Sequence, residues 1–288
     1  MNILTDWLAE WIKGLLVSGI MGNLGGLFDS VNNQVGDIAV DIGMTPWSFN
    51  PGVFSLIRNI SETVVLPIAG LLLTFVMTWE LIHLIIDRNN LHEIDTWIFF
   101  KWVFKTFIAV MILSNTFNIV MGIFDVAQHV VSSAGGIISN STAITSGMLA
   151  NLEDQLKLMD VGPLLGLWLQ SFLIQIVVIA MNLVIFIIVY GRMIEIYILT
   201  SLAPLPMATL TNHEMSSMGH NYLKSLLAVG FQGLLIMVCV AIYAVLIQSI
   251  AISGNPIGAI WACIGYTALL CFTLFKTGSV AKSVFNAH

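Results

Sequence analysis

The chain alternates between long apolar runs and shorter polar segments. A helix needs about 20 apolar residues to cross the hydrocarbon of a bilayer, and four runs meet this length: residues 63–86, 98–124, 163–190 and 222–252. A fifth run, residues 257–275, is shorter but carries no charge before Lys276. The pattern predicts an all-α, polytopic integral membrane protein with about five transmembrane helices.

A further apolar stretch, residues 193–210, contains Glu195, Pro204 and Pro206. Proline removes a backbone donor and clashes with the preceding turn, so a straight span is not expected there. Five spans with the N-terminus outside place seven of the ten Lys and Arg residues on the cytoplasmic side, whereas six spans give no clear excess. We therefore predict five spans, a cytoplasmic C-terminus, and a re-entrant or interfacial segment within residues 191–220.

Two regions outside the predicted spans are long, residues 1–62 and the outer loop 125–162. The first begins with an amphipathic helix, which Thr5 and Asp6 can cap and whose apolar face carries Trp7, Leu8, Trp11, Ile12 and Leu15. Such a helix lies in the lipid headgroup region or packs on the rest of the protein, and the pattern leaves both open. Residues 14–52 are rich in Gly, Asn and Asp and are expected to order only against partners.

Composition supports a membrane protein and excludes several other classes. Only 9% of the residues are charged, 58% are hydrophobic, and the mean hydropathy is +0.94. A soluble domain carries roughly 25% charged residues. The formal net charge of −6 argues against a protein that wraps nucleic acid with a basic surface. The cysteines Cys239, Cys263 and Cys271 lie in apolar runs, so they are expected to be small core residues.

Motifs of soluble enzymes are missing from the sequence. It contains no GxxxxGK[ST], GxSxG or HExxH pattern. Two groups contain residue types that bind metals: His213–Glu214 with His220, and His83 with Asp87, His92 and Glu93. A solvated loop is the favoured interpretation of the first, and a metal site is not favoured for the second. We therefore predict no catalytic residue, no cofactor and no metal site.

Charges inside the apolar runs are more informative, because burying them in a bilayer is costly. Glu80 lies about two turns inside the first predicted span, and Lys105 lies about as deep in the second, one turn after Lys101. Both positions are predicted to be near the cytoplasmic interface, so Glu80 can pair with Lys105 or Lys101. A structural ion pair between neighbouring helices is the favoured interpretation, and a site that lines a transport pathway is the alternative.

The segment after the third predicted span resembles a known family. It reads Tyr190-Gly191-Arg192 and then continues through an apolar stretch that closes in Ala203-Pro204-Leu205-Pro206. This resembles the central motif of the TrbL-type polytopic subunit of type IV secretion and conjugation systems, most closely in the compact form from Gram-positive bacteria. A Trp that often follows the proline loop in that family has no counterpart at Tyr222.

The resemblance implies a role for the whole chain. It implies a multi-pass subunit of the cell-membrane translocation channel, which acts with a separate ATPase and a coupling protein and contacts the transferred DNA or protein only transiently. Arg192, Pro204 and Pro206 are the residues that the motif carries over, as structural elements of the channel core. A homo-oligomer surrounded by membrane lipid is expected. The alternative is a small-solute or ion-coupled transporter that uses Glu80, Lys105 and Glu195.

Overall fold

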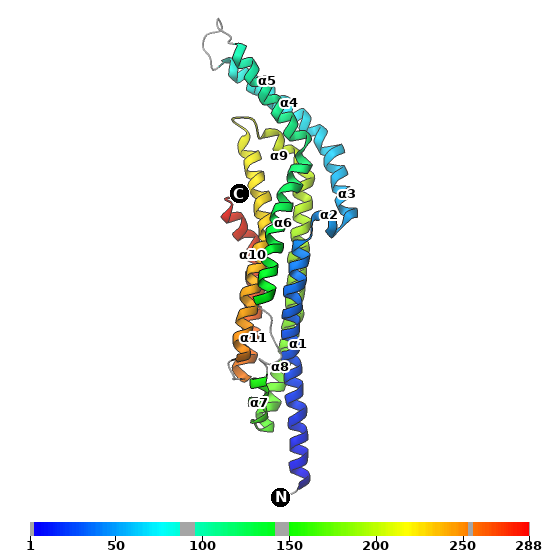
Figure 1. Cartoon of the computed structure of the whole chain (residues 1–288), viewed down its shortest axis with the longest axis vertical. Coiled ribbons are helices and arrows are strands. Elements are labelled where there is room, and N and C mark those ends of the chain that lie inside the picture. Colours follow the sequence, from blue (N-terminus) through cyan, green and yellow to red (C-terminus); the bar gives the residue numbers. More distant parts are fainter. Residues whose placement is uncertain (1–2, 87–95, 142–149, 253–255, 288) are drawn as a thin grey trace. The chain divides into compact units, whose positions relative to one another are not determined.

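The computed structural model of the chain describes residues 3–86, 96–141, 150–252 and 256–287. Within these ranges it is built from helices, with no strand (Figure 1). This confirms the predicted all-α class. The elements in chain order are α1 (Ile3–Gly43), α2 (Pro46–Phe49), α3 (Pro51–Asn59), the π-helix η1 (Ile60–Val65), α4 (Leu66–Ile86), α5 (Thr96–Ser114), α6 (Thr116–Ser141), α7 (Ala150–Lys157), α8 (Val161–Leu202), α9 (Pro204–Thr209), α10 (Ser216–Ile252) and α11 (Pro256–Val284).

The described helices include several that are long and apolar enough to cross a membrane. Five qualify: Trp7–Ser30, Pro51–Ile86, Val161–Leu202, Ser216–Ile250 and Ile257–Val284. A bent pair of helices, Phe99–Ser114 with Thr116–Ile137, adds a sixth if the pair forms one span. The chain is therefore a multi-pass membrane protein, as predicted. The set of five includes part of α1, which the sequence analysis placed in an outer amphipathic region.

The run 98–124, predicted as one transmembrane helix, is divided at Asn115 into α5 and α6, which meet at 65°. Three successive side chains donate to the carbonyl oxygens four residues back: Ser114 Oγ to Val110 (2.7 Å), Asn115 Nδ2 to Met111 (2.9 Å) and Thr116 Oγ1 to Ile112 (3.0 Å). Side chains that compete in this way for helix carbonyls bend helices. After the bend, α6 continues to Ser141, so helix occupies the first part of the predicted loop 125–162.

The N-terminal region also differs from expectation. Residues 14–52, expected to order only against partners, are helical apart from the short connections around Thr45 and Asn50. The reason is packing within the chain, because the apolar side chains of α1 from Leu16 to Ile42 join a buried cluster with α8. Close approach is possible at Gly19, where an added Cβ would come within 2.5 Å of the Trp168 ring. Polar contacts add to this packing, since Asn23 Nδ2 donates to Ser171 Oγ at 2.7 Å.

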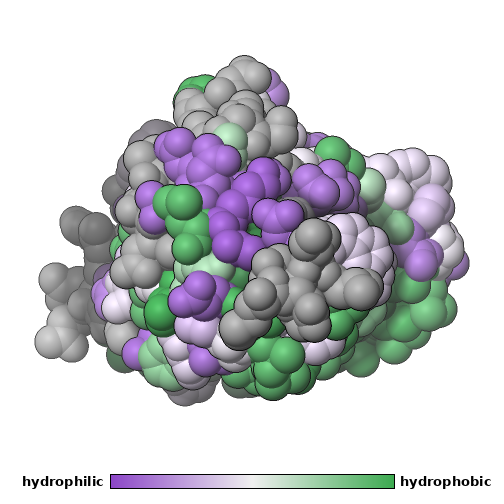
Figure 2. Space-filling view, turned by 90° about the horizontal axis from the view of Figure 1, so that it is seen from below, coloured by the Kyte–Doolittle hydropathy of each residue, from purple (hydrophilic) through white to green (hydrophobic). Residues whose placement is uncertain are grey.

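The chain divides into two compact units. Unit 1 comprises Met1–Gly43, Val131–Tyr190 and Gly233–Thr277, and its core is the large apolar cluster just described, to which α10 and α11 also contribute. Tyr243 and Thr267 share a buried hydrogen bond of 2.7 Å in this core. Figure 2 shows a face on which hydrophilic side chains gather, with hydrophobic ones around them. Unit 1 carries an exposed polar segment in α7, with Asp154, Gln155 and Lys157.

Unit 2 comprises Met44–Val130, Gly191–Gln232 and Gly278–His288. One of its apolar clusters joins α6, the last part of α8 and the first part of α10, around Phe124 and Met193. A second cluster joins α4, α5 and α9, around Met77 and Ala208. This second cluster brings the carboxyl end of α4 beside the amino-terminal half of α5 and the segment after α9, which is where most of the candidate charged residues lie.

Candidate functional site

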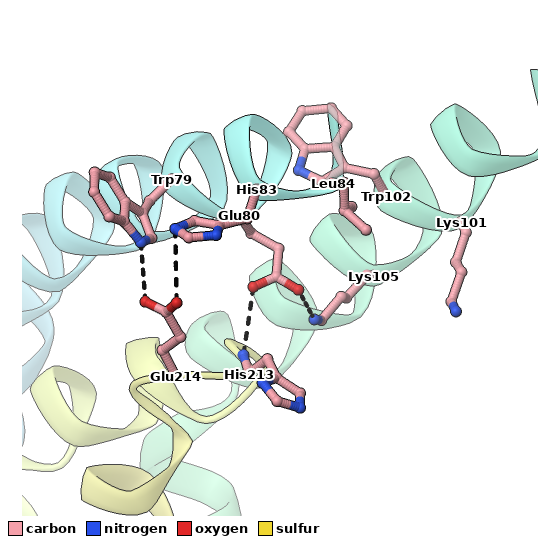
Figure 3. Close-up of a pocket in the computed structure, with 9 residues that line it drawn as sticks. All are labelled: Trp79, Glu80, His83, Leu84, Lys101, Trp102, Lys105, His213 and Glu214. Atoms are coloured by element: carbon pink, nitrogen blue, oxygen red, sulfur yellow. Dashed lines mark hydrogen bonds and ion pairs between the residues drawn. The ribbon is translucent and has the colours of Figure 1, made fainter. Parts of the chain in front are cut away.

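Glu80 is the centre of a polar cluster within unit 2 (Figure 3). The residue is buried, with 9% of its surface exposed, and its carboxylate forms an ion pair with Lys105 Nζ of α5. The other carboxylate oxygen accepts from Asn212 Nδ2 at 2.9 Å and from the backbone N–H of His213 at 3.4 Å. Glu80 therefore connects three parts of the chain, α4, α5 and the segment between α9 and α10.

A second carboxylate, Glu214, adds to the same junction. Its side chain accepts from Trp79 Nε1 at 3.1 Å and lies 3.6 Å from His83 Nε2. The rings of Trp79 and His83 also contact each other, with centroids 5.1 Å apart. Glu80 of α4 and Glu214 of the segment between α9 and α10 thus both hold residues 212–214 against the end of α4 (Figure 3).

Asn212 organises this segment, and the sequence analysis did not single it out. The residue is almost completely buried, and its Oδ1 accepts from the backbone N–H groups of Glu214 (2.9 Å) and Met215 (2.8 Å). A side-chain oxygen that accepts from N–H groups two and three residues ahead is the usual cap at a helix start. An Asn four residues before the start of α10 is a sequence pattern from which this cap could have been predicted. Its hydrogen bond to Glu80 could not, because it joins residues far apart in the sequence.

The structure pairs Glu80 with Lys105, one of the two partners that the sequence allowed. Lys101 lies one turn earlier on α5, and it lines a cavity together with Glu80 and Lys105. Glu195 pairs instead with Lys282 of α11, at 3.1 Å between Oε1 and Nζ. Both side chains of this second pair are about half exposed. The alternative set Glu80, Lys105 and Glu195 is thus split between two separate ion pairs.

Arg192 lies in a different part of unit 2. It is buried, with 2% of its surface exposed, and it donates from Nε to the Val229 carbonyl and from Nη2 to the Gly230 carbonyl, each at 3.1 Å. The planar guanidinium suits two adjacent acceptors of this kind. Gly230 also permits close packing, because an added Cβ would lie 3.1 Å from Ala127 of α6. Arg192 therefore ties α8 to α10 where α6 and α10 are in close contact.

The prolines end α8 and begin α9. Pro204 has no N–H to donate to the Thr200 carbonyl, which instead accepts from the Ala203 N–H (3.3 Å) and from Ser61 Oγ of η1 (3.4 Å). The segment 193–210 thus continues α8 to Leu202 and then forms the short α9. Pro204 lies buried at the junction, and the Pro206 carbonyl oxygen lies close to Gly219, where an added Cβ would be 2.9 Å from it.

In the described part of the chain, no cluster of three or more His, Cys, Asp or Glu side chains could hold a metal ion. His220 Nδ1 lies 2.7 Å from the Ser216 carbonyl oxygen. His83 contacts Glu214, whereas Asp87, His92 and Glu93 lie outside the described residues.

Comparison with known proteins places the chain in a family. Residues 31–204, about three fifths of the chain, match the family model described as TrbL/VirB6 plasmid conjugal transfer like protein. The chain belongs to this family. The resemblance noted in the sequence is thereby confirmed, and the protein is a membrane subunit of a conjugal transfer system. No curated protein and no solved structure matches the chain.

The part that matches the TrbL/VirB6 model contains Glu80, Lys101, Lys105, Arg192, Glu195 and Pro204. Their partners lie partly beyond it: the Asn212–Glu214 segment, the Val229 and Gly230 carbonyls, and Lys282. Membership of a conjugal transfer family also implies that the subunit associates with other components of that system.

Proposed function

We propose that this TrbL/VirB6 family member is a non-catalytic channel subunit of a type IV secretion machine. In this proposal, several copies of the chain form part of the path by which DNA or protein crosses the cell membrane. A separate ATPase and a coupling protein supply the energy and the substrate. The N-terminus lies outside the cell and the C-terminus lies in the cytoplasm.

The observation that carries this proposal is the way in which the charged side chains of the apolar helices are bonded. Glu80 is held by Lys105, Asn212 and the His213 N–H, and Glu195 is held by Lys282. Arg192 is held by two backbone carbonyls of α10. Each of these contacts joins different elements of one chain, which is what a structural framework requires.

The same contacts weigh against an ion-coupled transporter. Charged residues that couple transport converge on one site and exchange their partners with the transported ion. Glu80, Lys105 and Glu195 are instead divided between two ion pairs at different places in unit 2, so they do not converge on one solute site. A subunit that lines a path in a larger assembly needs no such site of its own.

The proposal is tested in donor cells whose copy of the gene is disrupted and then restored with a tagged chain. We expect disruption to abolish conjugal transfer and the restored chain to recover it. After formaldehyde crosslinking, precipitation of the tagged chain should recover the transferred DNA strand. The control is a donor that makes the tagged chain but has an inactive transfer ATPase, from which the DNA should not be recovered.

A second experiment separates the two hypotheses. The purified chain, reconstituted alone into liposomes, should carry no ion or solute flux, because the channel requires its partners. Robust, saturable ion flux that is lost in Glu80→Gln would contradict the channel proposal. Glu80→Gln in donor cells should reduce the amount of assembled subunit and the transfer frequency together, as expected for a structural contact.

A further inference from the structure

The cluster around Glu80 borders a cavity of about 360 Å³ in unit 2. Its walls are the carboxyl end of α4, the first half of α5, and His213 with Glu214 (Figure 3). The cavity opens to the surface, because Lys101, His213 and Glu214 are all exposed. The framework role assigned above accounts for the ion pair at its base, but it leaves the open cavity itself unexplained.

The two carboxylates of the cavity are occupied by donors of the protein. Glu80 accepts from Lys105, Asn212 and the His213 N–H, and Glu214 accepts from Trp79 and lies near His83. The ion pair uses Lys105, so Lys101 stands at the mouth as the lysine without a carboxylate partner among the residues that the structure describes. Lys101 and the exposed Glu214 lie at opposite ends of the cavity (Figure 3), so the charge available at the Lys101 end is positive, which favours an anionic group such as phosphate there.

The residues around the opening of the cavity, here called its mouth, are of the types that proteins place at the edge of a bilayer. Trp79 and Trp102 line the cavity, and Trp97 is 72% exposed near the start of α5. Tryptophans gather at the headgroup level of membranes, where lysines extend toward the lipid phosphates. Exposed apolar side chains continue along the same two helices away from the mouth, with Phe75 on α4 and Phe104 and Phe107 on α5.

We propose that this cavity binds a phospholipid, with the headgroup phosphate at Lys101 and the acyl chains along the exposed apolar surfaces of α4 and α5. The occupant is a membrane lipid and not a soluble anion, because the phosphate position adjoins exposed apolar side chains of α4 and α5, which acyl chains would cover and a soluble anion would leave uncovered. The lipid would bridge the end of α4 and the start of α5 beside the contact that Glu80 makes with the segment 210–215. This inference does not depend on the proposed function.

The test measures binding of phosphatidylglycerol to the purified full-length chain in detergent by native mass spectrometry. Lys101→Gln removes the exposed charge at the mouth, and we expect its tightest phosphatidylglycerol site to weaken about fivefold, the effect typical of one lysine near lipid phosphate. Lys101→Arg should keep most of the affinity. Lys276→Gln, at an exposed lysine of α11 in unit 1, should bind as the wild type does.

Two further arms identify what is bound. Diacylglycerol with the same acyl chains has no phosphate, so the wild type and Lys101→Gln should bind it equally. Inorganic phosphate in excess should not displace phosphatidylglycerol. The proposal is overturned if Lys101→Gln binds phosphatidylglycerol as tightly as the wild type, or if inorganic phosphate displaces the lipid as a competing soluble ligand.

Discussion

At the scale of single residues, Glu80 supports three elements through one carboxylate. Glu80→Gln keeps the size of the side chain but removes the charge that Lys105 pairs with, and it leaves the donors of Asn212 and His213 with a weaker acceptor. We expect a loss of about 1–3 kcal/mol in the free energy of unfolding, the usual value for hydrogen bonds to a charged group. The measurement is thermal unfolding in detergent, followed by tryptophan fluorescence.

The matched control for this change is Glu62→Gln. Glu62 is paired with Arg58 at 2.9 Å, but both side chains are about half exposed. Exposed pairs of this kind contribute less than about 1 kcal/mol. Equal shifts in the unfolding midpoint of the two variants would show that Glu80 has no special part in holding unit 2 together.

Two glycines provide a second comparison at this scale. An added Cβ at Gly219 would lie 2.9 Å from the Pro206 carbonyl oxygen and 2.9 Å from Leu210 Cδ1, whereas at Gly265 nothing lies within 4 Å. Gly219→Ala should therefore destabilise the protein by about 1–3 kcal/mol through overpacking. Gly265→Ala should stabilise α11 by up to about 1 kcal/mol, because alanine favours helix. Unfolding midpoints that move in the same direction would contradict this prediction.

The carboxyl group of Asp41, in the last turns of α1, gives the fold a pH dependence. Burial, together with the nearby Asp37 carboxylate, raises the pKa of Asp41 above its ordinary value of 3.8. A raised pKa means that the fold favours the protonated form, so stability is greatest in acid and falls as the pH rises through the folded-state pKa. Asp41→Asn should therefore raise the unfolding midpoint at neutral pH.

This advantage of Asp41→Asn should disappear as the pH is lowered toward 3.8, where both forms of the protein carry a neutral side chain. The measurement is the unfolding midpoint between neutral pH and pH 4. A stabilisation by Asp41→Asn that is the same at every pH would rule out the titration.

At the scale of elements, the bend between α5 and α6 is attributed to side chains that bond to helix carbonyls. Replacing Ser114, Asn115 and Thr116 with Ala, Ala and Val removes these donors, so the two helices should straighten from their 65° bend. With arms of 11 residues at 1.5 Å per residue, spin labels at Phe104 and Val126 should move apart by about 5 Å. The measurement is the distance by pulsed electron paramagnetic resonance.

The control for the bend is Thr74→Ala with Thr78→Ala. These two residues of α4 also donate to carbonyls four residues back, but they are not consecutive and the helix continues through them. Their removal should leave the distance between the labels unchanged. An unchanged distance in the variant of residues 114–116 would instead assign the bend to tertiary packing.

The helices show what the sequence could and could not predict. The membrane helices could be predicted from the long apolar runs, because a span needs about 20 residues of high average hydropathy. The same averaging hides the bend at Asn115, where three adjacent polar side chains alter the backbone. The depth of Glu80 and Lys105 in their runs was enough to suggest a pair. The carbonyls that hold Arg192 were not predictable, because they belong to residues more than 35 positions away and depend on how α8 and α10 pack.

At the scale of the whole molecule, the N-terminal helix has to be placed relative to the bilayer. The Trp7–Ser30 segment is long enough to cross, but it is the least apolar of the five candidate spans. It also carries Glu10, Lys13 and Asp29 within its length. Charge placed inside a span is costly, but the apolar side chains of α1 from Leu16 to Ile42 pack along α8, itself a candidate span. Tyr197 Oη, in the segment predicted to be cytoplasmic, donates to the Pro46 carbonyl oxygen at 2.7 Å, just after the end of α1. We therefore predict that α1 crosses the membrane with its N-terminus outside.

This prediction is tested by labelling single cysteines in intact cells with a reagent that does not cross membranes. The background has Cys239, Cys263 and Cys271 replaced by alanine. Glu10→Cys lies near the start of the candidate span and should be labelled from outside, whereas Trp47→Cys lies after it and should be labelled only after the cells are permeabilised. Ser216→Cys and Ser279→Cys should also be labelled only after permeabilisation, because both are predicted to lie in the cytoplasm. Labelling of Glu10→Cys and Trp47→Cys from the same side would show that α1 does not cross the membrane, and labelling of Ser216→Cys from outside would show that the segment with Pro204 and Pro206 crosses it.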